Sequence, residues 1–142
     1  KSRGLITLNS SDPYEYPKIL FNYLQDEEDL KQTRECIHVA RKILSQAALA
    51  EHAGKEVGPG TSAQSDDELN EYIRSKADTA YHPCGTCKMG VDDMAVVDEN
   101  LKVKGIQNLR VIDASVIPEI PSANLNAPTL MIAEKGADAI LN

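Results

Sequence analysis

The order of the periodic segments along the chain limits the fold more than any other feature of the sequence. Apolar residues recur at helical spacing over about residues 27 to 48, and a shorter helical pattern follows over about residues 66 to 77. Only two short β-rich segments precede them, at Leu5 to Leu8 and Pro17 to Tyr23. A doubly wound sheet requires strands that alternate with helices, and this chain lacks that alternation. We therefore predict an α+β fold without a complete parallel sheet.

The two predicted helices carry N-terminal signals that support this interpretation. Four consecutive acidic residues, Asp26 to Asp29, stand where the helix dipole is positive. Ser65 and Glu68 have the spacing of a capping box, in which each residue satisfies a backbone N–H of the other. A long amphipathic helix followed by a shorter one is therefore the firmest structural prediction for the first half of the chain.

The pattern changes after Ala80. Short β runs at residues 96–97, 101–103 and 109–112 are separated by turn-forming residues, and they predict a hairpin followed by a strand. A final helix is predicted to begin at Pro128, because proline suits the first position of a helix.

Composition excludes several classes of function. The 15 basic and 22 acidic residues give a net charge of −7, which repels phosphate backbones, so nucleic acid is not expected as a partner. Three cysteines form an odd set without a secretory signal, which favours reduced thiols. No apolar run is long enough to span a membrane, so any membrane contact would be peripheral. The chain begins at Lys1 without an initiator Met, and we expect it to be a piece of a longer protein.

The segment from Tyr81 to Gly90 contains a histidine, two cysteines, two glycines and a proline. The Cys-x-x-Cys spacing of Cys84 and Cys87 is compatible with a redox pair or with half of a zinc site. Neither function is favoured, because no βαβ unit surrounds the pair and the other candidate ligands do not form a second pair. Those other ligands are Cys36, His38 and His52. We therefore predict no metal site, and we interpret the cysteines as small buried thiols.

Two polar positions remain as candidates for chemistry. His82 precedes Pro83 and a glycine-containing turn, a rigid loop of the kind that presents a side chain to a site. Asn124 and Asn126 stand just before the terminal helix. They could serve only as helix-entry residues, or they could face a group that accumulates negative charge at the positive end of the helix.

Together these segments resemble the C-terminal part of the glucose-methanol-choline (GMC) flavoenzymes. Four motifs carry the resemblance in the family's order, and the similarity extends upstream over essentially the whole chain. The upstream half is most similar to the choline-oxidising branch of the family. The motifs are His82–Gly90, Ala95–Asp98, Leu109–Pro118 and Asn124–Lys135, and the upstream matches are Ser2–Gly4, Asn22–Leu24 and Gln64–Glu68.

The resemblance implies an FAD-dependent enzyme that oxidises an alcohol, choline, to betaine aldehyde in the synthesis of glycine betaine. It also implies a catalytic pair, His82 and the asparagine ten positions before Glu134, which is Asn124. In the family these side chains face the flavin N5 and the carbinol group of the substrate. The stretches that the resemblance assigns to the cofactor are Tyr81, Asp113–Ala114 at the diphosphate and ribityl chain, and Asn126, Ala127 and Pro128 at the flavin pyrimidine edge.

The resemblance also implies a division of the chain and a partner. Residues 1–80 would belong to the substrate-binding domain, and residues 81–142 would return to the FAD-binding domain. The Gly-x-Gly-x-x-Gly fingerprint is absent, so most of the FAD site would lie in an N-terminal half outside this chain, and the chain alone would be inactive. The electron acceptor is not identified, and the expected location is the cytoplasm or the inner-membrane surface. Two alternatives stay open, a family member acting on another alcohol and a non-catalytic interaction domain.

Overall fold

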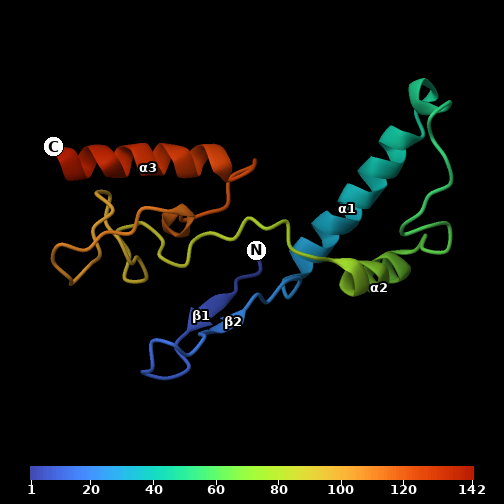
Figure 1. Cartoon of the computed structure of the whole chain (residues 1–142). Coiled ribbons are helices and arrows are strands. Elements are labelled where there is room, and N and C mark those ends of the chain that lie inside the picture. The colour runs from blue at the N-terminus through green and yellow to red at the C-terminus, as the bar shows by residue number, and fades with distance from the viewer. The chain divides into compact units, whose positions relative to one another are not determined.

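The computed structural model describes all 142 residues, which form two compact units, Lys1–Asp78 and Thr79–Asn142 (Figure 1). Three α-helices and one two-stranded sheet confirm the predicted α+β class, and no parallel sheet is present. None of the helices is both long and apolar enough to cross a bilayer. The elements are β1 (Leu5–Thr7), β2 (Lys18–Leu20), α1 (Glu27–Leu44), η1 (Ala47–Leu49), α2 (Asp66–Lys76), η2 (Ala114–Val116) and α3 (Asn126–Leu141).

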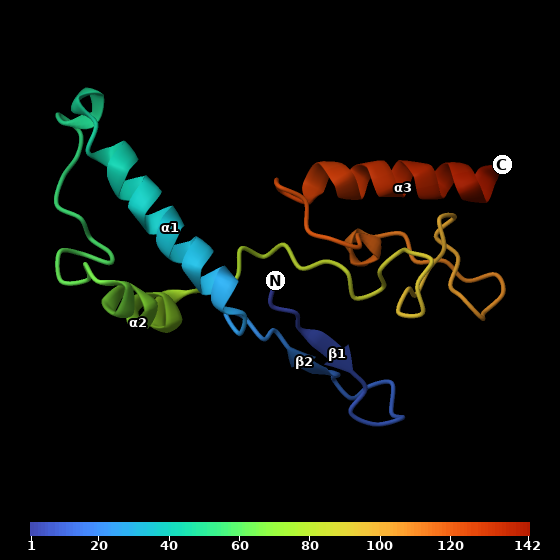
Figure 2. The ribbon, with the colours of Figure 1, turned by 180° about the vertical axis from the view of Figure 1, so that it is seen from behind.

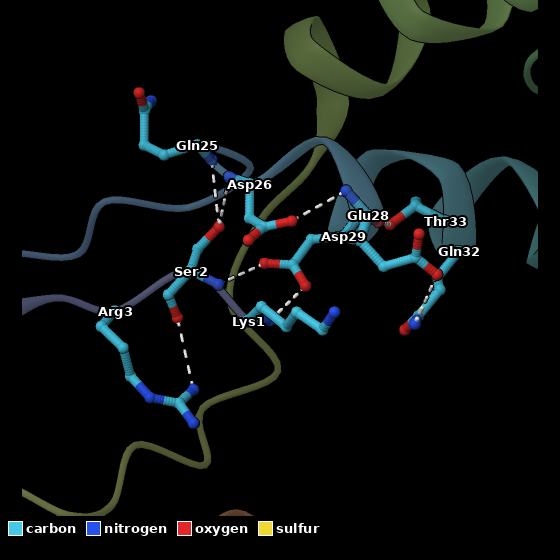
Figure 3. Close-up of polar contacts among 9 residues, drawn as sticks. All are labelled: Lys1, Ser2, Arg3, Gln25, Asp26, Glu28, Asp29, Gln32 and Thr33. Atoms are coloured by element: carbon cyan, nitrogen blue, oxygen red, sulfur yellow. Dashed lines mark hydrogen bonds and ion pairs between the residues drawn. The ribbon is translucent and has the colours of Figure 1, made fainter.

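The first unit begins with a hairpin that is joined to the start of α1. Strands β1 and β2 pair antiparallel, with Ile6 opposite Ile19. The hydroxyl of Ser2 accepts the backbone N–H groups of Gln25 and Asp26, each at 3.0 Å, and the Ser2 N–H donates to the Asp29 carboxylate (Figure 3). Because these bonds occupy donors around the N-terminus of α1, Ser2 helps to set where the helix begins.

Helix α2 packs against α1 through a small core and one arginine of α1. Leu30, Leu69 and Ile73 are buried. Arg34 donates to the side-chain oxygen of Asn70 at 2.7 Å and lies 3.3 Å from the Asp66 carboxylate. The predicted capping box of Ser65 and Glu68 is present, and it places the start of α2 as expected.

Helix α1 is shorter than predicted. It ends at Leu44 rather than near residue 48, and a single 3₁₀ turn, η1, follows it. The Ser45 hydroxyl and the Gln46 side-chain amide both donate to the Lys42 carbonyl, at 3.0 and 2.8 Å. These side chains take the place of backbone donors at the end of the helix. The spacing of apolar residues carries no information about such bonds.

The core of the second unit lies between α3 and the loops that precede it, and its buried members include Val97, Leu101, Val116 and Ile132. In both views α3 runs alongside the stretch that carries η2 (Figure 2). At Gly136, an added Cβ would lie 2.4 Å from Cγ2 of Ile112. The glycine therefore allows the α3 backbone to approach Ile112 closely.

The predicted hairpin and strand after residue 95 are wrong, because the structure contains only isolated bridges there, such as Val97 with Val103 and Lys102 with Arg110. Tight turns interrupt each run. The Asp98 carboxylate accepts the N–H groups of Asn100 and Lys102, each at 2.9 Å, and the bond from the Lys102 N–H contributes most to lowering the pKa of Asp98. Three positive φ angles, at Leu101, Gly105 and Asn108, turn the chain before a longer ladder can form.

Candidate active site

His82 lies on a loop whose backbone direction is set by the residues beside it. Tyr81 has φ = 60°, a left-handed conformation that is unusual for a residue other than glycine. Its N–H donates to the Thr79 hydroxyl at 3.0 Å. Pro83 on the other side restricts His82 to extended backbone conformations. The His82 side chain is half-buried, whereas the Tyr81 side chain is 78% exposed.

The rest of this loop is held by backbone hydrogen bonds to η2. The N–H of Cys87 donates to the Ser115 carbonyl at 3.0 Å, and the N–H of Met89 donates to the Val116 carbonyl at 2.8 Å. Gly85 has φ = 87°, and a Cβ there would lie 3.3 Å from the Ile117 carbonyl oxygen. The loop therefore has little freedom to move relative to η2.

Asn124 is placed by the start of α3. The next residue, Leu125, occupies the N-cap position of the helix, and its side chain is buried in the core. The Leu125 carbonyl accepts both the N–H of Thr129 at 2.9 Å and the Thr129 hydroxyl at 2.6 Å. Burial of Leu125 and these two bonds hold the backbone from which the Asn124 side chain projects.

The structure brings His82 and Asn124 together across 42 residues of sequence. The side-chain nitrogen Nδ2 of Asn124 lies 2.8 Å from Nε2 of His82. An amide nitrogen can only donate, so Nε2 is the acceptor in this hydrogen bond. A hydroxyl group that takes the place of this mutual bond can donate to Nε2 and accept from Nδ2, so the pair suits a hydroxyl-bearing ligand.

The helix start that follows Asn124 offers further donors. Helix α3 begins at Asn126, two residues earlier than predicted, so Pro128 is its third residue. Proline is tolerated there because the first-turn N–H groups have no partner inside the helix. No side chain caps this end. The N–H groups of Asn126 and Ala127 therefore combine with the positive end of the helix dipole, which favours an acceptor or a negative charge.

The other sequence-predicted residues occupy separate positions in this unit. The Asp113 carboxylate accepts the N–H of Ser115 at 2.7 Å and the Ser115 hydroxyl at 2.5 Å, so it caps η2, and Ala114 is the first residue of that turn. These contacts are local to the turn. No disulfide joins the three cysteines, and the prediction that they are buried is wrong, because Cys36 is exposed and the other two are half-buried. No three His, Cys, Asp or Glu side chains gather into a metal-binding group.

Sequence reasoning missed the residues that position the pair. The contacts beside the pair are made with the backbone by Thr79, Gly85 and Thr129. Of these three residues only the glycine has a sequence signal, because glycine is typical of turns. Thr79 stands two residues before a left-handed tyrosine, and a left-handed tyrosine cannot be recognised from sequence.

Comparison with protein families gives a match over almost the whole chain. The model of the GMC oxidoreductase family matches residues 1–133. The oxygen-dependent choline dehydrogenase of Klebsiella pneumoniae (strain 342) is 53% identical over 139 residues, which is 98% of this chain and 25% of that protein. The oxygen-dependent choline dehydrogenase of Escherichia coli O157:H7 (strain EC4115 / EHEC) is 50% identical over the same shares. The chain therefore spans about a quarter of the length of these relatives.

Solved structures give the same picture. The pyridoxine 4-oxidase from Mesorbium loti superposes with a TM-score of 0.90 at 36% identity, over 97% of this chain and 27% of that one. A formate oxidase variant from Aspergillus oryzae RIB40, studied for its FAD modification, superposes with a TM-score of 0.91 at 34% identity, over 99% of this chain and 25% of that one.

Proposed function

The chain belongs to the GMC oxidoreductase family, and from that premise we propose that it is the C-terminal part of an FAD-dependent choline dehydrogenase. The observation that carries the proposal is the direct contact of His82 Nε2 with Asn124 Nδ2 at 2.8 Å. The resemblance had selected these two residues as a catalytic pair, and their side chains offer a base and a donor to one substrate oxygen.

The residues of this chain fit FAD at one end of its ring system. The uncapped start of α3 directs the N–H groups of Asn126 and Ala127 outward, and Pro128 brings no further donor. Such a helix end stabilises the negative charge that a flavin gains near its pyrimidine edge on reduction. Under the proposal Tyr81 and the turn Asp113–Ala114 also lie on the cofactor side, and the remainder of the cofactor site lies outside this chain.

The proposed reaction removes a hydride and a proton from the alcohol. Bound FAD supplies the hydride acceptor at flavin N5. In the observed contact the one lone pair of His82 Nε2 faces Asn124 Nδ2, so the substrate hydroxyl displaces that donor, and its proton then passes to Nε2. Asn124 Nδ2 donates to the substrate oxygen while negative charge develops on it. The C–H and O–H bonds of the carbinol break, and the product is the aldehyde.

Choline is the substrate that the comparisons support best. Identity to the two choline dehydrogenases is 50–53%, whereas identity to the oxidases of pyridoxine and formate is 34–36%. The pair itself recognises only a carbinol, so oxidation of another alcohol by the same two residues is the second candidate.

The proposal includes a division of labour and a partner. Residues 1–80 contribute to the substrate side, residues 81–142 to the cofactor side, and the N-terminal portion of the same enzyme completes both. Large apolar side chains that stay exposed on the hairpin and on α3 support this, because such patches mark surfaces that another part covers. They include Leu5, Ile6, Phe21, Leu130, Met131 and Ile140. The proposed location is the cytoplasm or the surface of the inner membrane.

Substitution of His82 in the full-length enzyme tests the function. His82→Ala should lower kcat/KM for choline by about a hundredfold or more, with FAD still bound, because the proton acceptor is lost. His38→Ala is the matched control, since His38 is an exposed histidine on α1. Near-normal turnover by the His82→Ala enzyme with full FAD content would show that the assignment is wrong.

A further inference from the structure

The loop that carries His82 contains one backbone conformation that its own sequence disfavours. Tyr81 has φ = 60°, where the Cβ of any residue other than glycine is crowded by the backbone. Tyrosine lacks the short polar side chain with which asparagine or aspartate stabilises this region locally. The conformation must therefore be held by a neighbouring group.

The Thr79 side chain is in position to hold it. Its hydroxyl oxygen accepts the N–H of Tyr81 at 3.0 Å, a local side-chain to backbone bond that spans two residues. The left-handed residue bends the chain immediately before His82. A change of φ at Tyr81 would therefore swing the His82 side chain away from Asn124.

We propose that Thr79 is a positioning residue for His82: its hydroxyl holds Tyr81 in the left-handed conformation that directs the imidazole to Asn124. The histidine is then fixed from three sides. Thr79 acts on the backbone before it, Pro83 restricts its own backbone, and Asn124 holds Nε2 at 2.8 Å. The catalytic part of this inference rests on the proposed function, whereas the positioning part does not.

The test compares Thr79→Val with Thr79→Ser in the full-length enzyme. Valine keeps the shape of threonine and removes the hydroxyl, and serine keeps the hydroxyl. For Thr79→Val we expect kcat for choline to fall by about tenfold to a hundredfold, since displacement of a reacting group by about 1 Å has effects of this size. KM should change by less than about twofold, because binding of the substrate elsewhere is unaltered. Thr79→Ser should restore kcat to within about threefold of the wild type.

Thr61→Val is the matched control, because Thr61 is an exposed loop threonine in the first unit. FAD content, read from flavin absorbance, should be the same in all variants. Thr79→Ala provides a second enzyme without the hydroxyl if the valine variant does not fold. A serine variant that loses as much kcat as the valine variant would overturn the proposal, because the hydroxyl would then not be the acting group.

Crystal structures of the same full-length variants give a readout that does not require activity. In Thr79→Val we expect Tyr81 to leave the left-handed region and the contact between His82 and Asn124 to be lost, and in Thr79→Ser we expect both to persist. If the wild type oxidises no alcohol but the valine variant shows this displacement, the proposed function fails and the positioning role stands. If the valine variant keeps both the contact and its kcat, the positioning role is refuted.

Discussion

Replacing Gly136 by alanine should destabilise α3 through one identifiable contact. Gly136 is buried in the middle of the helix, on the side that faces Ile112. A Cβ at position 136 would lie 2.4, 2.8 and 3.1 Å from Cγ2, Cδ1 and Cγ1 of Ile112. Favourable carbon–carbon contacts lie at about 3.5–4.0 Å, so the two elements must move apart by about 1 Å or Ile112 must leave its rotamer.

Two opposing effects decide the size of the change. Alanine is favoured over glycine inside a helix by about 1 kcal/mol. Overpacking of a well-filled site costs about 1–3 kcal/mol. The net effect of Gly136→Ala is therefore a loss of about 0–2 kcal/mol. In an Ile112→Ala background all three contacting atoms are gone, and the same substitution should instead stabilise the helix by about 1 kcal/mol.

The decisive quantity is the coupling between the two positions. Hydrogen–deuterium exchange of peptides from α3, measured across a urea series for the four proteins of the double-mutant cycle, gives the free energy of opening of the helix. We expect a coupling energy of about 1–3 kcal/mol. A coupling energy near zero, with Gly136→Ala stabilising both backgrounds equally, would refute the inferred close approach of α3 to Ile112.

Three further predictions concern the site, a helix cap and the chain by itself. Asn124→Ala in the full-length enzyme should raise the barrier for choline oxidation by about 2–4 kcal/mol, as for loss of a donor to a developing oxyanion, and steady-state kinetics measures this. The N–H groups of Ser65 and Gln64 and the Ser65 hydroxyl lower the pKa of Glu68, so the advantage of the wild type over Glu68→Gln in thermal unfolding should be present at neutral pH and disappear as pH falls through that lowered pKa. The purified 142-residue chain should bind FAD weakly or not at all in a flavin-fluorescence titration, and saturable micromolar binding would contradict the view that most of the cofactor site lies elsewhere.

The helices of the first unit were predictable because local signals determine them. The Ser65 and Glu68 capping box and the acidic residues at the start of α1 act within one helical turn, so their effect can be read from spacing alone. The end of α1 was not predictable from periodicity. Side chains of Ser45 and Gln46 donate to the Lys42 carbonyl, which in a continuing helix would accept a backbone N–H instead. The strands predicted after residue 95 are absent for a related reason. The turns at Leu101 and Asn108 need residues in the left-handed conformation, and this conformation has only a weak signal in the sequence.

The candidate site was predictable in its two side chains and not in its support. Resemblance to a family pointed to His82 and Asn124, and their spacing of 42 residues would not have brought them together by any local rule. The threonine that holds Tyr81 and the threonine that bonds the Leu125 carbonyl are common residues in unremarkable sequence. Their importance comes from backbone conformations that only the folded chain reveals.

The division of the chain at residue 78 has an evolutionary consequence. Both members of the histidine–asparagine pair, the loop that holds the histidine and the helix that holds the asparagine lie in Thr79–Asn142, which has its own buried core. The core around the pair is therefore built from residues of Thr79–Asn142 itself. If the first unit contributes to the substrate side, as we propose, a lineage can change that unit to accept alcohols of new shape and still inherit the core that aligns the proposed reacting groups.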